Sequence, residues 1–248
     1  MDLGGRLVLV TGASAGIGRE TAIFLSECNA RLILTARHGE RLEQTASLLR
    51  AGDHRIEARD LTSTDEIPAW MKRVCEENGP LGGLVHCAGV HSAFPLRVLT
   101  TEKLESVMRI NVSAALMLAK GFRQKGCSTA GSAMVLVSSV AGLVGEAGVA
   151  AYAASKAALV GLARSLAMEL AGQGIRVNCV APGFVETEMG GRLREALTPE
   201  QFQALEAKHP LGLGTPRDVA HGIGFLLAET SRWITGTTLV IDGGYTAH

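Results

Sequence analysis

The chain has 248 residues, which is long enough to bury a large core, and 47% of them are hydrophobic, which excludes a disordered protein. Lys+Arg and Asp+Glu each number 24, so the basic excess typical of nucleic-acid-binding proteins is absent. The five cysteines are scattered without a CxxC pair, and the N-terminus shows no signal-peptide pattern. We therefore predict a cytoplasmic protein with reduced thiols and no membrane span.

Seven short aliphatic runs have the composition of strands that are buried on both faces. Their hydrophobicity is continuous and does not alternate, which is typical of a parallel sheet covered by helices. Segments with helical spacing lie between them, at residues 20–28, 39–49 and 153–170. The predicted strands are residues 6–11, 31–36, 55–60, 81–87, 133–138, 176–180 and 238–241.

This alternation predicts an α/β fold: a Rossmann-like, doubly wound parallel sheet of about seven strands with helices on both faces. No shift in composition suggests a linker, so we predict a single domain over residues 1–248. Residues 188–208 interrupt the alternation with a charged, helical segment. We predict that this insertion is a lid over the substrate, and an ordinary surface excursion stays open as the alternative.

A glycine-rich turn follows the first predicted strand. Residues 11–18 read Thr-Gly-Ala-Ser-Ala-Gly-Ile-Gly, and a helical segment comes next. Glycine lets the backbone turn sharply and approach a ligand closely, and a helix N-terminus offers unpaired N–H groups to a pyrophosphate. In this strand–turn–helix context the turn predicts dinucleotide binding.

Four polar residues have the composition of a proton-transfer site. Tyr152 and Lys156 are four positions apart in a helical segment, which places them on one face. Ser139 follows the fifth predicted strand, and Asn111 lies in an earlier helical stretch. A nearby ammonium lowers the pKa of a phenol from about 10 toward neutrality, and a serine hydroxyl can hold a substrate oxygen on which charge develops.

With these motifs, the sequence resembles the classical short-chain dehydrogenase/reductases over residues 3–245, and within them the 3-oxoacyl-acyl-carrier-protein reductases. The resemblance implies one NAD(P)-binding Rossmann-fold domain and a homotetramer. The catalytic tetrad that it implies is Asn111, Ser139, Tyr152 and Lys156, with Asn111 anchoring a water of a proton relay. The coenzyme-binding residues that it implies are Gly12, Ser14, Gly16, Ile17, Gly18, Asp60, Leu61, Ala88, Gly89, Tyr152, Lys156, Pro182, Gly183, Val185 and Thr187.

The end of the second predicted strand bears on the choice of coenzyme. An acidic residue there binds the ribose 2′-OH of NAD, whereas an arginine accommodates the 2′-phosphate of NADP. This chain has Ala36 and Arg37, so we predict that Arg37 reads the phosphate and that NADP(H) is preferred, with NAD(H) possible. The second basic residue of the family pattern is absent, because Ala15 stands in its place. For Asp60, a strand-end cap stays open as the alternative.

The segment after the fourth predicted strand departs from the family pattern. Where the family usually shows Asn-Asn-Ala-Gly, this chain has His86, Cys87, Ala88 and Gly89. A single histidine at the end of a buried strand is more often a hydrogen-bonded core residue than a catalytic one, and this is what we predict for His86. Adjacent strand residues point to opposite faces, so His86 and Cys87 do not form a metal site, and we predict no metal.

These features together predict an NADP(H)-dependent oxidoreductase that transfers a hydride between nicotinamide and a carbonyl or secondary alcohol, with Tyr152 as the acid/base. Two alternatives stay open: a 3-oxoacyl-acyl-carrier-protein reductase in particular, and a non-catalytic coenzyme-binding sensor. The predicted partner is a small carbonyl or alcohol substrate, with an acyl thioester included, and neither nucleic acid nor membrane. The predicted pocket lining is His91, Ser92, Phe94, Val140, Leu143, Val144 and residues from 188 onward.

Surface charge argues against the carrier-protein alternative. A carrier protein is acidic, so its reductase should present basic side chains near the pocket mouth. At the two places where such relatives carry arginine, this chain has Ala130 and Gln173. Lys120, Arg123 and Lys125 lie nearby in the sequence and could compensate.

Overall fold

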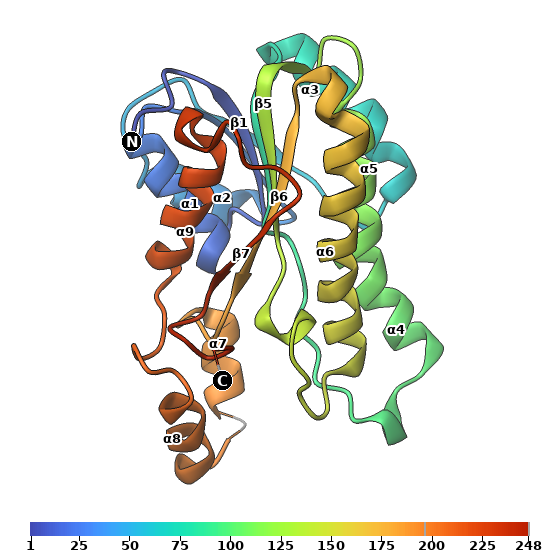
Figure 1. Cartoon of the computed structure of the whole chain (residues 1–248). Helices are drawn as coiled ribbons and strands as arrows, with labels where there is room; N and C mark the ends of the chain where they lie inside the picture. Colours follow the sequence, from blue (N-terminus) through green and yellow to red (C-terminus); the bar gives the residue numbers. More distant parts are fainter. Residues whose placement is uncertain (196, 248) are drawn as a thin grey trace.

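Parallel strands form the centre of the structure. The computed structural model describes residues 1–195 and 197–247, and within them one seven-stranded sheet has the order β3-β2-β1-β4-β5-β6-β7 (Figure 1). Every pair of neighbouring strands is parallel. The strands are β1 (Leu7–Thr11), β2 (Arg31–Ala36), β3 (Arg55–Ala58), β4 (Leu81–His86), β5 (Ser128–Val137), β6 (Arg176–Pro182) and β7 (Thr238–Ile241).

Helices cover both faces of this sheet. Helices α1, α2 and α9 pack on one face, and α3, α5 and α6 pack on the other (Figure 1). In the described part of the chain, none of the helices has both the length and the apolar character needed to cross a bilayer. The covering helices are α1 (Gly16–Glu27), α2 (Gly39–Ala46), α3 (Ile67–Asn78), α5 (Ala114–Phe122), α6 (Ala150–Leu170) and α9 (Pro216–Leu227).

The strand order reverses between β1 and β4, because β1 is followed by β2 on one side while β4 lies on its other side. At such a point the connections leave toward opposite faces and open a crevice at the carboxyl ends of the strands. The doubly wound parallel sheet predicted from the sequence is therefore confirmed.

The sequence predicts that both faces of each strand are buried, and for β3 this prediction is wrong. Its residues are exposed or half-buried, because β3 is an edge strand that pairs only with β2. Strand β5 begins at Ser128, five residues before the predicted start. Its first five residues, 128–132, are small or polar and mostly exposed or half-buried, so they carry no aliphatic signal. The register of β5 against β4 shifts between Leu81 and Gly83.

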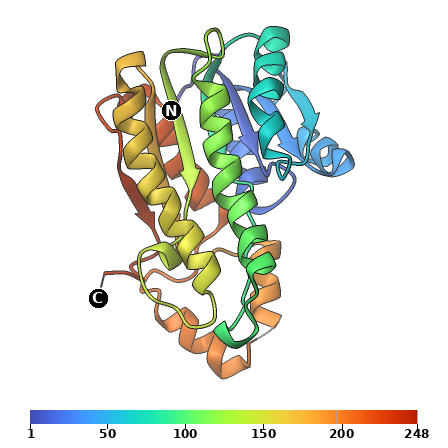
Figure 2. The ribbon, with the colours of Figure 1, turned by 90° about the vertical axis from the view of Figure 1, so that its right-hand side faces the viewer.

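Residues 188–208 form two short helices beyond the carboxyl ends of the strands. Figures 1 and 2 show both helices, α7 (Glu188–Glu195) and α8 (Pro199–Ala207), at the same end of the sheet as the start of α6. Thr198 caps α8 in a reciprocal capping box with Gln201. Residue 196 lies outside the described residues.

The interior divides into two apolar clusters, one on each side of the sheet. Phe122 is fully buried in the cluster beneath α3, α5 and α6. We expect Phe122→Ala to lower the free energy of unfolding by about 3–5 kcal/mol, because it leaves a cavity in a close-packed core. Denaturant-induced unfolding measures this loss. The control is Leu48→Ala, at a side chain 57% exposed, for which a loss above about 0.5 kcal/mol would contradict this view of the core.

Candidate active site

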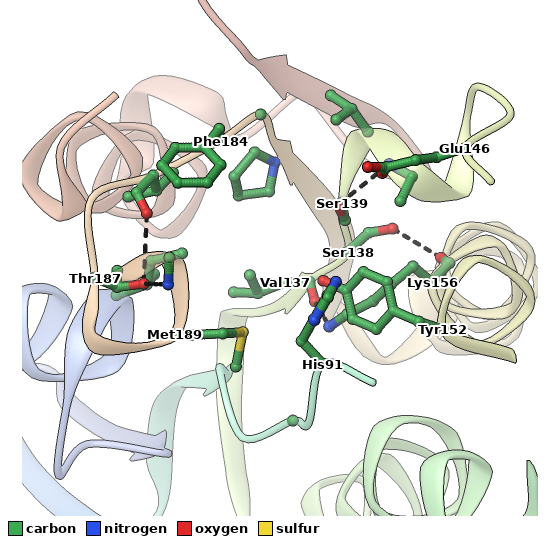
Figure 3. A pocket seen from close by; sticks show the side chains of 18 of the residues that line it. His91, Val137, Ser138, Ser139, Glu146, Tyr152, Lys156, Phe184, Thr187 and Met189 are labelled. Carbon is green, nitrogen blue, oxygen red and sulfur yellow. Dashed lines mark hydrogen bonds between the residues drawn. The ribbon is translucent and has the colours of Figure 1, made fainter. Parts of the chain in front are cut away.

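A pocket opens where the segments that follow β4, β5 and β6 meet the first turn of α6 (Figure 3). Its wall combines residues of these segments with residues of α7, α8 and the C-terminal tail. The predicted site residues that line it are Ile17, Gly89, Ser139, Tyr152, Lys156, Pro182, Gly183, Val185 and Thr187. The fold therefore brings together residues that are spread over most of the sequence.

Ser139 is the second residue after β5, and its hydroxyl is oriented by the backbone. Its Oγ accepts a hydrogen bond of 3.2 Å from the N–H of Ala141, at the start of a short 3-10 turn (Val140–Gly142). Since Oγ acts as the acceptor in this bond, the hydroxyl proton of Ser139 remains available as a donor toward the pocket. There it hydrogen-bonds to the side chain of Tyr152 and favours the phenolate.

The pKa of Tyr152 is raised above its ordinary value, mainly because the phenol is buried. The hydrogen bond from Ser139 opposes this shift, and the negative charge of Glu146 adds to it. The expectation that Lys156 lowers the pKa of this phenol below 10 is therefore not met in this structure. The physical reason is that burial dominates, while the Lys156 ammonium is directed at a backbone carbonyl.

Lys156 is buried, and its ammonium group is hydrogen-bonded to the last residue of β5. Its Nζ donates a hydrogen bond of 2.8 Å to the carbonyl of Val137 and lies 5.6 Å from the centre of the Tyr152 ring. Burial lowers the pKa of Lys156 to about 8. Ser138 donates from Oγ to the backbone carbonyl of Lys156 at 2.7 Å, so the first turns of α6 are fixed against β5 (Figure 3).

Asn111 lies in a π-helical turn (Arg109–Ser113) between α4 (Thr101–Met108) and α5. Its Oδ1 accepts from the N–H of Val90 at 2.9 Å, and its Nδ2 donates to the carbonyl of Val90 and to Oγ of Ser155. The side chain is therefore committed to tying the segment after β4 to α6. Its side-chain amide is thus occupied, and its predicted role of anchoring a relay water stays a prediction.

The glycine turn lies directly against the segment after β4. Gly12 and Gly16 have φ values of +67° and +50°. A Cβ on Gly12 would lie 2.8 Å from the backbone N of Ala88, and one on Gly18 would lie 2.3 Å from the carbonyl oxygen of Gly12, so neither position tolerates a side chain. Ala15 precedes α1 without a side-chain cap, which leaves the first N–H groups of this helix open to an anion, as a dinucleotide pyrophosphate requires.

The segment after β6 closes over this turn. A Cβ on Gly16 would lie 3.2 Å from Cγ2 of Thr187. The hydroxyl of Thr187 donates to the carbonyl of Val185 at 3.4 Å and accepts from the N–H of Gly190 at 3.0 Å, so it caps the start of α7 (Figure 3). Thr187 therefore reaches the predicted coenzyme pocket from a segment that also begins the insertion.

Arg37 lies in a shallow pocket at the carboxyl end of β2, together with residues 38–41. Asp60 is close enough to Arg37 for the guanidinium to help lower the pKa of its carboxyl, although the main cause is a hydrogen bond from the backbone N–H of Thr62, 2.9 Å from Oδ1. This contact closes a local turn over two residues and is not a helix N-cap, because the next helical turn (Thr64–Glu66) is preceded by Ser63. Leu61 is buried in the core.

Five residues of the lining were not predicted from the sequence, although Cys87 and Phe184 lie in segments with a family pattern: Cys87, Glu146, Phe184, His209 and Tyr245. Of the predicted lining, His91, Val140 and the insertion residues Met189, Gly190 and Leu205 are present, with the His91 ring edge-on to Tyr152 at 4.7 Å. Ser92, Phe94, Leu143 and Val144 lie outside it.

His209 joins three of these segments. It is buried, its Nε2 accepts from the N–H of Phe184 at 3.2 Å, and its Nδ1 is 2.9 Å from the carbonyl of Leu205 in α8. Its ring stacks on Tyr245 with the centres 4.9 Å apart. The C-terminal tail and α8 are thereby held against the segment after β6.

Comparison with known proteins identifies the family. A family model described as enoyl-(acyl carrier protein) reductase matches residues 12–246. A 3-oxoacyl-acyl-carrier-protein reductase from Vibrio cholerae is 37% identical over 98% of both chains. A cis-4-hydroxycyclohexanecarboxylate dehydrogenase from Sinomonas cyclohexanicum is 35% identical over 98% of this chain and 97% of that protein.

Solved structures agree with this result. A putative short-chain alcohol dehydrogenase from Sinorhizobium meliloti matches with a TM-score of 0.91 and 32% identity, covering 99% of this chain and 98% of that one. A 4-hydroxyisoleucine dehydrogenase complexed with NADH matches with a TM-score of 0.89 and 27% identity, covering 98% and 99%.

The chain belongs to the short-chain dehydrogenase/reductase family. It is an oxidoreductase that binds a nicotinamide coenzyme and transfers a hydride between this coenzyme and a C=O or CH–OH group. This part of the functional prediction is confirmed.

Two substitutions should move the pKa of Tyr152 in opposite directions. Glu146→Gln removes a charge that disfavours the phenolate, so the pKa falls, whereas Ser139→Ala removes a hydrogen bond that favours it, so the pKa rises. Phenolate absorbance during a pH titration measures both shifts, and the Tyr152→Phe protein supplies the signal of Tyr245 for subtraction. Shifts of the same sign in both variants would contradict this account of the site.

Proposed function

We propose that the protein is an NADP(H)-preferring carbonyl reductase and alcohol dehydrogenase in which Tyr152 exchanges the proton. The supporting observation is the convergence of the Ser139 hydroxyl, the Tyr152 phenol and the Lys156 ammonium on one pocket. Hydride addition to a carbonyl leaves negative charge on its oxygen. Two hydroxyl donors and a cation are the groups that such a charge requires.

In the reduction, the hydroxyls of Ser139 and Tyr152 bind the carbonyl oxygen of the substrate. As negative charge develops there, the proton of Tyr152 passes to it and the alcohol forms. The coenzyme, when bound, supplies the hydride and, in its oxidised form, a positive charge. Lys156, whose pKa is lowered to about 8, is a cation near neutral pH that can stabilise the phenolate and return a proton to it. Alcohol oxidation uses the same groups in the reverse order.

Several of the coenzyme-binding residues predicted from the sequence support the proposed coenzyme path. The turn at Gly12, Gly16 and Gly18 and the open N-terminus of α1 suit the pyrophosphate. Ser14 is held in this turn, because its carbonyl accepts from Nη2 of Arg19 at 2.6 Å. Ala88 and the residues that follow β6 complete the path to the proton-transfer groups.

The preference for NADP(H) rests on charge at the end of β2. Arg37 and Arg41 line the same shallow pocket, and Ala36 carries no charge that would repel a phosphate. An arginine fork matches the geometry of a 2′-phosphate. Two acidic groups lie nearby: Glu40 lines the same pocket, and Asp60 has its carboxylate engaged by the backbone of Thr62.

We also propose that residues 188–208 act as a lid on a single domain that spans residues 1–248. Met189, Gly190 and Leu205 of this insertion line the pocket. Glu188, at its start, lies 3.9 Å from Arg19 and 3.7 Å from Arg41, so the insertion also touches the coenzyme side.

For the substrate we propose a small, uncharged carbonyl compound or alcohol. A carrier-bound 3-oxoacyl thioester is the second candidate, which the 37% identity to a 3-oxoacyl-acyl-carrier-protein reductase favours. Ala130 and Gln173 are exposed and uncharged, and Glu146 places negative charge in the pocket, so an acidic carrier protein finds little attraction here. The presence of Ser139, Tyr152 and Lys156 in one pocket argues against the alternative of a non-catalytic coenzyme-binding sensor.

NADPH oxidation with three substrates separates these candidates: a small cyclic ketone, a 3-oxoacyl thioester of N-acetylcysteamine, and the same acyl group on a carrier protein. We expect turnover with the ketone and no gain from the carrier. A large gain from the carrier would favour the second candidate.

We propose further that the protein is a cytoplasmic homotetramer. Large apolar side chains are exposed on α6 and near β7, among them Met168 at 82% and Trp233 at 92%. The five cysteines are unpaired, as a reducing compartment requires. Light scattering that gives the mass of a 26.0 kDa monomer would overturn the tetramer.

Replacing Tyr152 with Phe should abolish turnover, because the proton donor is lost while the shape of the pocket is kept. We expect the loss to reach at least about a hundredfold in kcat, as for other general acids. Binding of NADPH, followed by its fluorescence, should persist. Turnover that stays near the wild-type rate would refute the proposed mechanism.

Replacing Arg37 with Ala should weaken NADPH binding about ten- to a hundredfold, since charge-assisted hydrogen bonds of about 1.5–3 kcal/mol are lost. Binding of NADH should change little. The matched control is Arg50→Ala, which removes the same charge from an exposed arginine that is bonded to Asn29 instead. Equal losses for both coenzymes would contradict the assignment of Arg37.

A further inference from the structure

The wall of the pocket is divided into a polar part and an apolar part. Figure 3 shows Glu146, Ser139 and Tyr152 on one side and Phe184 and Met189 on the other. The polar part comes from the segments between β5 and α6 and from the start of α6, whereas the apolar part comes from the segment after β6 and from the insertion. A substrate that fills this pocket therefore has a polar end at Tyr152 and an apolar end that faces the insertion.

Glu146 is the carboxylate of the polar part. Among the described residues that line the pocket, it is the only aspartate or glutamate. It lies in an exposed stretch between the 3-10 turn at Val140–Gly142 and the start of α6. No described residue gives its carboxylate a hydrogen bond or an ion pair. Both of its oxygens are thus available to a ligand.

The carboxylate lies close to the reacting groups. Its negative charge adds to the rise in the pKa of Tyr152, and Figure 3 shows Glu146 on the same side of the pocket as Ser139. Ser139 and Tyr152 are the groups proposed to hold the reacting oxygen of the substrate. A substrate group that contacts Glu146 is therefore carried by a carbon near the reacting one, and not by the far end of the molecule.

The chemistry of this group follows from the charges in the pocket. An ionised carboxylate only accepts hydrogen bonds, so a substrate that displaces its water must offer a donor. The ammonium of Lys156 lines the same pocket and repels a cationic donor, and Glu146 itself repels an anionic substrate. The donor that meets both conditions is an uncharged hydroxyl.

We propose that Glu146 determines substrate specificity by accepting a hydrogen bond from a second hydroxyl, on the carbon next to the reacting one. The preferred substrates are then uncharged vicinal hydroxy ketones and the corresponding diols, and substrates with a carboxylate at that position are rejected. This inference rests on the proposed function of Ser139 and Tyr152 and narrows the substrate class of the same site. Phe184 and Met189 contact the carbon frame of the substrate.

Three alcohols with one ring and different neighbouring groups test this specificity: cyclohexane-1,2-diol, 2-methylcyclohexanol and 2-hydroxycyclohexanecarboxylate. The measurement is kcat/KM for their oxidation with saturating NADP⁺. For the wild type we expect the diol to exceed the methyl compound about tenfold or more, because a site built for a hydroxyl discriminates strongly against an analogue that lacks it. The carboxylate compound should give the lowest value.

Two variants separate the hydrogen bond from the charge. Glu146→Ala removes both, so the ratio of diol to methyl compound should fall to within about twofold of one. Glu146→Gln keeps an acceptor oxygen without the charge, so part of the diol preference should remain, while the carboxylate compound gains about tenfold relative to the methyl compound. The matched control is Glu43→Gln, at an exposed carboxylate of α2 outside the pocket, which should leave both ratios unchanged.

These ratios isolate specificity from other effects of the substitutions. A change in the pKa of Tyr152 alters the rates of all three alcohols alike and cancels in each ratio, and thermal unfolding shows that each variant is folded. A wild-type ratio of diol to methyl compound near one would overturn the inference, and so would the wild-type ratio in the Ala variant. If the wild type oxidises none of the three alcohols, the proposed function fails. If it oxidises them with ratios that do not depend on Glu146, only this inference fails.

Discussion

The buried ammonium of Lys156 is the constraint around which this site is built. A charge removed from water must be given partners, and the carbonyl of Val137 at the end of β5 is one of them. That contact requires α6 to start close to β5. The hydrogen bond from Ser138 to the Lys156 carbonyl holds it there, and Gly142 allows the approach, since a Cβ on it would lie 2.7 Å from the backbone of Ala157. Ser139 and Tyr152 are placed by the same packing.

The pKa shifts in the site follow from this burial. The phenol of Tyr152 is held neutral and Lys156 loses its proton more readily than a free lysine, because both charged forms are costly away from water. The two pKa values are thereby moved apart, with that of Tyr152 above that of Lys156. Transfer of a proton from the Lys156 ammonium to a Tyr152 phenolate is therefore downhill in free energy.

The two halves of the proposed ligand path are linked through the start of the insertion. Thr187 packs on Gly16 of the glycine turn, and Glu188 lies near Arg19 and Arg41. Met189 and Gly190, directly after them, line the pocket at the proton-transfer end. Residues 187–190 thus connect the two ends: the first two contact the proposed coenzyme side, and the last two line the pocket. A movement of α7 therefore affects both sides.

The sequence by itself determined the parts that depend on local pattern. Continuous aliphatic runs predicted the parallel sheet, the spacing of Tyr152 and Lys156 predicted their common face, and the glycine turn predicted its own strand–turn–helix setting. The catalytic and coenzyme roles of these residues remain predictions. Only the tertiary structure decided that β3 is an exposed edge, that Glu146, His209 and Tyr245 join the pocket, and that His86 faces the turn that holds Asn111. The physical reason is that burial and the directions of hydrogen bonds depend on contacts between segments far apart in the chain, which no local pattern records.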